Sequence, residues 1–332
     1  ERKLPASIAA EFSVGLLFAA HKNPAIASFQ ALLFLHERRL PAALHACVNT
    51  VDSFQEALVV ARDPSASTLR EAQQLCRVAL EAIRLTAHTD RLFRSAHILR
   101  MDMPYEKETL SAAQREVVRA NGLDEAYIRP MCFLGSEGMG LRADNLKTHV
   151  MVASWAWPSY MDPEARDRGI RIATSSYTRH HVNITMCKAK ANGNYINSIL
   201  ALREAMDAGF EEALLLDNEG YVAEGSGENF FLVRDGILYT PELTSCLEGI
   251  TRDSILRIAA DQGLTVREKR ITRDEVYVAD EAFFTGTAAE VVPIRELDNR
   301  TIGSGARGPI TEKLQSIYFE AVRGEQSQYA EW

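Results

Sequence analysis

The sequence predicts an α/β protein with two domains, and three observations support this class. The chain has 332 residues, which is enough to bury a large core. From residue 85 onward, segments rich in β-branched and aromatic residues alternate with segments that carry apolar residues at helical spacing. A polar stretch with a proline at each end, 158–163, marks the domain junction. We therefore predict an α+β domain over 85–156, an interdomain loop over 157–165 and a larger α/β domain over 166–332.

The segment before residue 85 has a different composition from the rest of the chain. Residues 1–84 are rich in Ala and Leu, contain only Gly15 as glycine, and have neither Tyr nor Trp. Their pattern is loosely helical. The smaller domain is then predicted to contain a helix over 109–122 that stops at its glycine, followed by strands over 125–135 and 148–157.

The larger domain shows the same alternation of strands and helices. Helices are predicted over 194–209, 252–263 and 308–324, each ending at a glycine. Strands are predicted over 169–178, 212–217, the hairpin 229–241, and 281–290, where the strand leads into a turn of small residues. Asp235-Gly236 is the turn signal of the hairpin.

Composition excludes several classes of protein. The formal net charge is −8, whereas a nucleic-acid-binding protein usually has a basic face. No apolar run is long enough to span a bilayer. The five cysteines are scattered without a C-x-x-C pair, so we expect a reduced, cytoplasmic protein without a metal site.

Four short stretches carry candidate chemistry. They are "CKAKANGNYINS" at 187–198, "EGSGENFF" at 224–231, "GITRDSI" at 249–255 and "TGTAAE" at 285–290. Taken singly, each favours an ordinary turn, and a lysine is usually a solvated charge. Together they supply a lysine, a carboxylate and a helix N-terminus that can bind phosphate. Pyridoxal phosphate needs this set, because lysine forms its Schiff base and a carboxylate keeps its ring nitrogen protonated.

From about residue 86 to the C-terminus the chain resembles the branched-chain amino acid aminotransferases of the fold-type IV pyridoxal-phosphate family. The resemblance rests on stretches in the family's order, including "HTDRLFRSA", "AYIRP", "GSEGMG", "SWAWPSY", "KANGNYINS", "DNEGYVAEGSGENFF", "LEGITRDSI" and "FFTGTAAEVVPIRELDNRTIGSGARGPIT". It implies a D-amino acid aminotransferase-like fold and pyridoxal 5′-phosphate as cofactor. Residues 1–84 do not match the family, which has aromatic and glycine-rich first strands there.

The resemblance also assigns the cofactor site. Lys190 precedes the family's Ala-x-Gly-x-Tyr run and is therefore the expected Schiff-base lysine and catalytic base, whereas Lys188 is expected to face solvent or form an ion pair. Glu224 would pair with the pyridine nitrogen and Tyr195 would contact the phenolic oxygen. The expected phosphate ligands are Arg91, the backbone N–H groups of Ile250 and Thr251, and the hydroxyls of Thr251 and Thr287.

The substrate residues follow in the same way. The turn around Thr287 and Ala288 would hold the α-carboxylate, and Arg129 would receive the distal carboxylate of glutamate. The residues expected to line the side-chain pocket are Tyr127, Trp157, Tyr160 and Leu247. Leu141 would reach the site of a neighbouring subunit, so the resemblance implies a homodimer or a larger homo-oligomer.

The resulting hypothesis is a transaminase that acts on L-leucine, L-isoleucine and L-valine with 2-oxoglutarate, and that binds neither nucleic acid nor membrane. Two alternatives stay open. One is another fold-type IV enzyme, either a D-amino acid transaminase or an aminodeoxychorismate lyase. The other is a non-catalytic or catalytically impaired chain, because the atypical residues 1–84 favour a reading-frame or gene-model change over a natural helical replacement.

Overall fold

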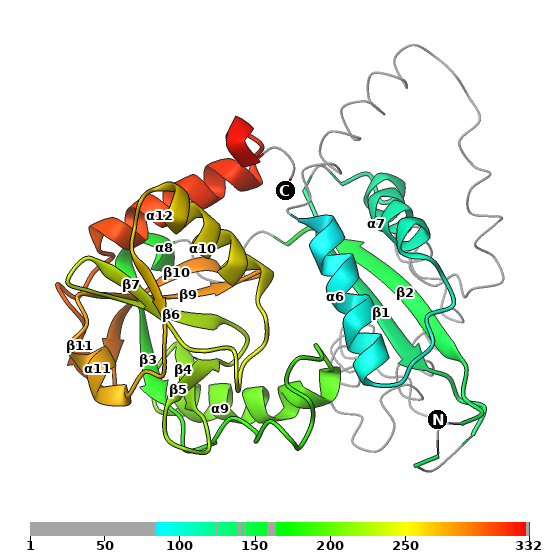
Figure 1. Ribbon diagram of the computed structural model, residues 1–332, viewed down its shortest axis with the longest axis horizontal. Coiled ribbons are helices and arrows are strands. Elements are labelled where there is room, and N and C mark those ends of the chain that lie inside the picture. Colours follow the sequence, from blue (N-terminus) through cyan, green and yellow to red (C-terminus); the bar gives the residue numbers. More distant parts are fainter. Residues whose placement is uncertain (1–83, 124, 139–140, 143, 158–163, 330–331) are drawn as a thin grey trace, which may run out of the picture. The chain divides into compact units, whose positions relative to one another are not determined.

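The computed structural model describes residues 84–123, 125–138, 141–142, 144–157, 164–329 and 332 (Figure 1). The predictions made for residues 1–84 therefore fall almost entirely outside the described residues. The described chain forms two compact units, which are taken in turn. One comprises Leu99–Ala156, and the other combines residues 84–98 with Trp157–Trp332. The helix at the start of the described chain thus groups with the larger unit rather than with the predicted smaller domain.

The smaller unit is a helix on a two-stranded sheet. Its elements are α7 (Lys107–Ala120), β1 (Tyr127–Leu134) and β2 (Thr148–Trp155). The strands are antiparallel, with Tyr127 opposite Trp155. Helix α7 is fixed to β2 because the buried Ser154 hydroxyl donates to the Val117 carbonyl at 3.2 Å. The predicted helix and both predicted strands are confirmed within a few residues at their ends.

The larger unit is built on a nine-stranded mixed sheet. Its strands are β3 (Ile170–Thr174), β4 (Glu212–Leu216), β5 (Val222–Gly225), β6 (Asn229–Arg234), β7 (Ile237–Thr240), β8 (Val266–Glu268), β9 (Glu281–Gly286), β10 (Glu290–Leu297) and β11 (Arg300–Thr301). The strand order is β11-β10-β3-β4-β5-β6-β7-β8, and β9 pairs with both β10 and β6. These pairings close a ring through β10, β3, β4, β5, β6 and β9. Strands β4 and β6 are buried except at their last residues, Leu216 and Arg234, as expected from their continuous apolar runs.

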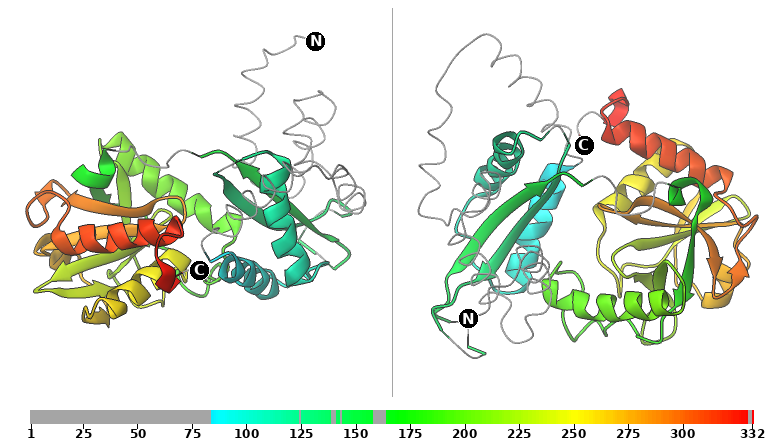
Figure 2. Two further views of the ribbon diagram at one scale, coloured as in Figure 1. Left: turned by 90° about the horizontal axis from the view of Figure 1, so that it is seen from above. Right: turned by 180° about the vertical axis from the view of Figure 1, so that it is seen from behind.

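Five helices of the described chain pack against this sheet, namely α8 (Ala165–Arg168), α9 (Tyr195–Asp207), α10 (Ile250–Asp261), α11 (Arg273–Tyr277) and α12 (Pro309–Val322). Helix α6 (Leu85–Ile98) is instead bonded to the loops that precede α9 and α10. Helices α10 and α12 contact each other and lie on the same face of the sheet (Figures 1 and 2). Their side chains join a core cluster that contains Phe231, Ile258 and Tyr318. None of the helices in the described residues is long and apolar enough to cross a membrane.

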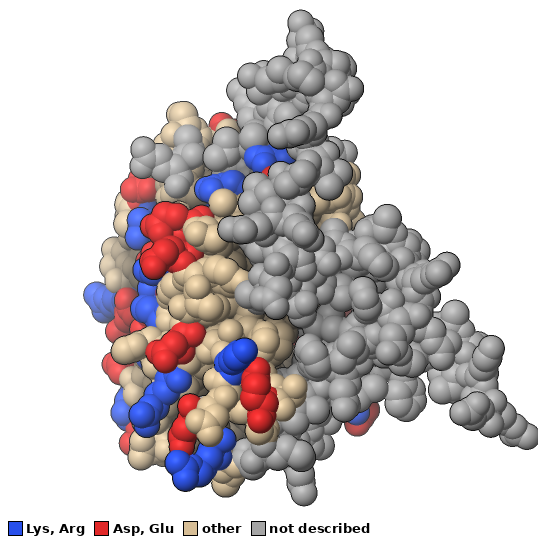
Figure 3. Space-filling model, turned by 90° about the vertical axis from the view of Figure 1, so that its right-hand side faces the viewer, with Lys and Arg blue, Asp and Glu red and all other residues tan. Residues whose placement is uncertain are grey.

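The helices and strands predicted for this unit are present, whereas several other elements, both long and short, were not predicted. Helices α9, α10 and α12 and strands β3, β4, β6, β7 and β9 are confirmed. The hairpin turn is also confirmed, because Asp235 and Gly236 both have positive φ angles, 51° and 72°. Strand β10, which follows directly after the turn of small residues, was not predicted. On the face of the molecule in Figure 3, basic and acidic side chains of the described residues are interspersed.

Candidate active site

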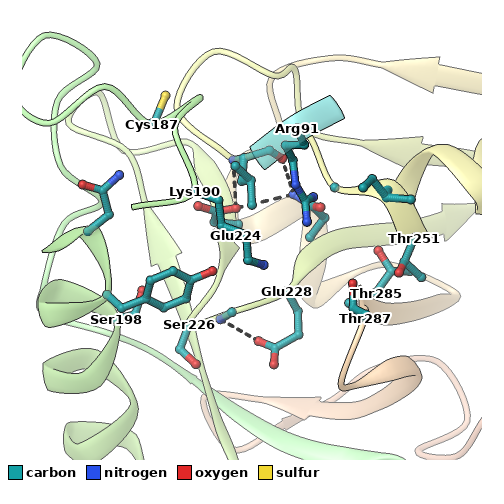
Figure 4. Close-up of a pocket in the computed structure, with 18 of the residues that line it drawn as sticks. Arg91, Cys187, Lys190, Ser198, Glu224, Ser226, Glu228, Thr251, Thr285 and Thr287 are labelled. Carbon is teal, nitrogen blue, oxygen red and sulfur yellow. Dashed lines mark hydrogen bonds between the residues drawn. The ribbon is translucent and has the colours of Figure 1, made fainter. Parts of the chain in front are cut away.

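The candidate site is a cavity in the larger unit, with about 560 Å³ of empty space that is partly open to solvent. Its walls come from α6, the loop before α9, strands β5, β6 and β9, and the N-terminus of α10 (Figure 4). Eight predicted site residues line it: Arg91, Lys190, Tyr195, Glu224, Leu247, Ile250, Thr251 and Thr287. Segments from residue 91 to residue 287 therefore meet in one place.

The two lysines that stand two residues apart have different environments. Lys190 lines the cavity, and its Nζ lies 5.9 Å from the centre of the Tyr195 ring. The Lys190 backbone N–H donates to the Ser95 hydroxyl at 3.0 Å, which ties this loop to α6. Lys188 points elsewhere: its half-buried ammonium donates to the carbonyls of Leu243 and Cys246. The expectation that Lys188 faces solvent or forms an ion pair is therefore wrong.

A buried ion pair lies on one side of the cavity. The Glu224 Oε1 atom is 2.7 Å from Arg179 Nε, and both side chains are less than a tenth exposed. The other carboxylate oxygen accepts hydrogen bonds from the Leu247 backbone N–H at 3.1 Å and the Asn229 amide at 3.4 Å. Burial raises the pKa of Glu224, while the charge of Arg179 and the bond from Leu247 oppose that shift. The carboxylate is thus fixed in orientation and faced by a cation.

A second side of the cavity is suited to an anion. Helix α10 starts after Gly249, and its first N–H groups, on Ile250 and Thr251, have no partner within the helix. The positive end of the helix dipole adds to them. Arg91 is buried and is held by the Glu248 carbonyl, to which its Nη1 donates at 3.2 Å. Figure 4 shows Thr251, Thr285 and Thr287 grouped on this side.

A neutral histidine lies next to this arginine. His88 Nδ1 is 3.5 Å from Arg91 Nη2. Burial, and then the charges of Arg91, Lys190 and Arg84, lower the pKa of His88 to about 3. His88 therefore adds no positive charge to the site at neutral pH, and Arg91 remains the cation there.

Those of the remaining predicted residues that the structure describes lie elsewhere in the chain. Ala288 is in the turn between β9 and β10, next to Thr287. Tyr127 and Arg129 belong to the smaller unit, where the Arg129 guanidinium lies 5.2 Å from the Tyr127 ring and 5.4 Å from the Trp155 ring. Trp157 is half-buried and Leu141 is fully exposed. Tyr160 lies outside the described residues.

A match to one protein family covers about two thirds of the chain and identifies the family to which the chain belongs. Residues 77–297 match the family described as "Amino-transferase class IV". The chain is a class IV aminotransferase. The expected family is thereby confirmed, and the match begins slightly before residue 86.

This aminotransferase has similar relatives of known name and structure. It is 63% identical over 249 residues to a branched-chain-amino-acid aminotransferase of Pseudomonas aeruginosa, and the match covers 75% of this chain and 81% of that protein. The solved T.th. branched-chain amino acid aminotransferase, complexed with N-(5′-phosphopyridoxyl)-L-glutamate, is 49% identical with a TM-score of 0.72. The same enzyme complexed with 4-methylvaleric acid also gives 49% and 0.72. Both comparisons cover 75% of this chain and 82% of the solved one.

Two charged residues of this aminotransferase site escaped the sequence analysis. Arg179 pairs with Glu224 although 45 positions separate them (224 − 179). It stands in a loop without periodicity, so no pattern in the sequence marked it. Glu228 lines the cavity within a stretch that was singled out, but only Glu224 was given a role there. For Glu228, the available signal was a second acidic residue in a loop otherwise rich in small residues.

Proposed function

We propose that this chain is a pyridoxal-phosphate-dependent transaminase that exchanges amino groups between 2-oxoglutarate and L-leucine, L-isoleucine or L-valine, yielding branched-chain 2-oxo acids and L-glutamate. One observation carries the proposal. Lys190 lies in a single cavity that has a buried carboxylate–arginine pair on one side and an anion-binding helix terminus on another. The names of the similar enzymes support the same activity.

The residues of the cavity fit pyridoxal phosphate. The buried Thr285 hydroxyl has no hydrogen-bond partner in the described structure, and it lines the cavity beside the N-terminal N–H groups of α10. These groups, with Arg91 and the Thr251 and Thr287 hydroxyls, would hold the phosphate dianion. Gly249 leaves space there, because a Cβ on it would lie 1.8 Å from Asn229 Oδ1.

When bound, pyridoxal phosphate supplies an electron sink that stabilises negative charge on the substrate α-carbon. The residues of the chain provide the rest. Lys190 Nζ would hold the cofactor covalently and then, as the released amine, move the proton removed from the α-carbon. The Glu224 carboxylate would keep a proton on the pyridine nitrogen, and Arg179 keeps that carboxylate ionised. The Tyr195 hydroxyl would bind the phenolic oxygen and orient the ring.

The proposed substrate contacts are those that the resemblance to the family assigns. Thr287 and Ala288 would bind the α-carboxylate through the N–H groups of their turn, and Leu247 would contact the apolar side chain. Tyr127, Trp157 and Tyr160 would complete that apolar surface, and Arg129 would bind the distal carboxylate of 2-oxoglutarate. The 4-methylvaleric acid bound by a 49% identical enzyme has the branched skeleton of leucine, which supports this substrate class.

We also propose a cytoplasmic homodimer or larger homo-oligomer. Leu141 is fully exposed in the single chain, and a large apolar side chain in that position suits contact with a neighbouring subunit. The cysteines among the described residues, Cys132, Cys187 and Cys246, are all free thiols, which suits a reducing compartment.

A half-reaction tests the proposed function. The cofactor-loaded protein is mixed with L-leucine alone, and the absorbance of the cofactor is followed until its amine form appears. One equivalent of L-leucine should be consumed for each bound cofactor that is converted to its amine form. Later addition of 2-oxoglutarate should restore the original spectrum. D-Alanine is the matched control. Conversion by D-alanine but not by L-leucine would favour the D-amino acid transaminase, and no absorbance band at all would favour a non-catalytic chain.

A further inference from the structure

The lining of the cavity contains a second carboxyl group that the proposed mechanism does not use. Glu228 is 5% exposed and its Oε2 accepts a hydrogen bond from the Gly227 backbone N–H at 2.9 Å. Figure 4 shows its side chain reaching into the same cavity as Lys190 and Glu224. A carboxyl group buried this deeply needs either a cation or a proton.

Two glycines leave the space that the Glu228 side chain occupies. A Cβ on Gly225 would lie 2.9 Å from Glu228 Oε2, and a Cβ on Gly286 would lie 3.4 Å from Glu228 Cγ. These glycines come from two of the stretches that the sequence analysis singled out. A side chain on Gly225 would push the carboxyl group out of its place, so the room around Glu228 depends on these small residues.

The groups that face Glu228 are mostly acidic. Glu212 on β4 is fully buried, and its Oε2 has no hydrogen-bond partner among the described residues. Glu224 on β5 is the other acidic neighbour, and Lys190 is the facing cation. None of the ion pairs formed within the described part of the chain includes Glu228 or Glu212. Arg179, the buried guanidinium of the same lining, is already paired with Glu224.

These surroundings favour the uncharged form of the acid. Burial raises the pKa of Glu228 well above its ordinary value, and the negative charges of Glu212 and Glu224 raise it further. The Gly227 N–H and Lys190 oppose this shift without cancelling it. Burial also raises the pKa of Glu212, to about 7.

We propose that Glu228 is a positioning residue that stays a neutral carboxylic acid at physiological pH, leaving Glu224 as the ionised carboxyl group of the described lining. A second negative charge in this cavity would stabilise the protonated form of Lys190 and weaken it as a base. The effect on catalysis rests on the proposed function, whereas the protonation state of Glu228 does not.

The first test measures folding rather than catalysis. The full chain and its Glu228→Gln variant are melted from about pH 4, below the ordinary pKa of a glutamic acid, to about pH 9. Because the folded-state pKa is raised, the stability contributed by neutral Glu228 is complete at low pH and is lost as the pH rises through the folded pKa. Glutamine cannot ionise, so the variant does not share this loss. The Tm of the variant minus the Tm of wild type should therefore increase as the pH increases.

Glu204→Gln is the matched control. Hydrogen bonds from Ser175 and Ser176 lower the pKa of Glu204, so its carboxylate stabilises the folded chain at higher pH. The Glu204→Gln variant should therefore have a lower Tm than wild type by an amount that stays nearly constant above about pH 5, because the folded and unfolded pKa values of Glu204 both lie below that pH. A Glu228→Gln difference that is flat or falls with pH would overturn the proposal.

Infrared spectroscopy of the wild-type chain provides a second measurement, which also decides the matter if Glu228→Gln does not fold. A protonated-carboxyl band should persist above the range near pH 7 in which Glu212 titrates. Loss of the band together with Glu212 would contradict the proposal. In the leucine half-reaction, a Glu228→Gln rate lower than that of wild type by more than about a hundredfold would also contradict it, because it would mean that the ionised form is needed.

Discussion

The cavity has two chemically different sides. One side relies on ionisable side chains: Glu224 is fixed by Arg179, with Glu228 nearby. The other side relies mainly on the backbone, because the N–H groups at the start of α10 have no partner within the helix and suit an anion, with hydroxyls and Arg91 beside them. Burial shifts the pKa of an ionisable side chain and so changes its charge, whereas a helix N–H group does not titrate and stays a hydrogen-bond donor. The first side is therefore suited to controlling protons, and the second to holding a constant anion.

Lys190 lies between these two sides, and its removal should have the largest effect. Lys190→Ala should abolish covalent attachment of the cofactor and lower turnover by at least about a thousandfold, because both the attachment point and the base are lost. Turnover with leucine and 2-oxoglutarate measures this.

Lys188→Ala is the control for that variant. It should keep the cofactor attached but lose about 1–3 kcal/mol of stability, because the carbonyls of Leu243 and Cys246 lose their donor. Comparable loss of turnover in the two variants would contradict the distinction between the two lysines.

Glu224→Gln should have the next largest effect, on the proton-controlling side. The neutral amide cannot hold a proton on the pyridine nitrogen, so the half-reaction with leucine should slow by about a hundredfold or more, while the cofactor stays bound. Arg179 would lose its counter-charge, which should cost about 3–5 kcal/mol of stability. Near-normal turnover would show that the proposed pairing with the cofactor is wrong.

Arg129→Leu should separate the two substrates. A guanidinium bond to a carboxylate contributes about 1.5–3 kcal/mol, so the KM for 2-oxoglutarate should rise by about ten- to a hundredfold. The KM for leucine should change little, since leucine has no distal carboxylate. Equal effects on both substrates would point to a structural role, through the stacking of Arg129 on Tyr127 and Trp155.

Thr251→Val should have the smallest effect, on the anion-binding side. The backbone N–H groups of α10 remain, so losing one hydroxyl should weaken cofactor binding by about 0.5–1.5 kcal/mol, or roughly two- to tenfold. Titration of the cofactor-free chain with pyridoxal phosphate measures this, and the rate of the half-reaction should stay unchanged at saturation. A changed rate at saturation would mean that Thr251 contacts the reacting part of the site.

The two sides also differ in how far they could be predicted from sequence. The helix terminus at 249–251 was visible because a glycine and a threonine precede a helical pattern that ends at Gly263. Arg179 was not visible, since its pairing with Glu224 depends on how two distant segments meet. Lys188 was expected to face solvent or form an ion pair because only Lys190 fits the family's motif. The segment is an irregular loop, with Met186 at a positive φ of 56°, so no periodicity could show that Lys188 points toward backbone carbonyls.

Three long helices could be predicted because a periodic pattern needs several turns, and the shortest strands offer no such pattern. Helices α9, α10 and α12 have enough turns for a periodic pattern and a glycine stop. Strands such as β8, with three residues, and β11, with two, are too short to show any period. Their positions depend on pairing with neighbours in the sheet.

Borohydride reduction of the cofactor-loaded chain, followed by peptide mapping, tests the central claim most directly. Reduction makes the bond between cofactor and lysine permanent, so the modified peptide identifies the attached residue. We predict a single adduct on Lys190, the lysine that lines the cavity. An adduct on Lys188, which is held by two backbone carbonyls, would contradict this assignment.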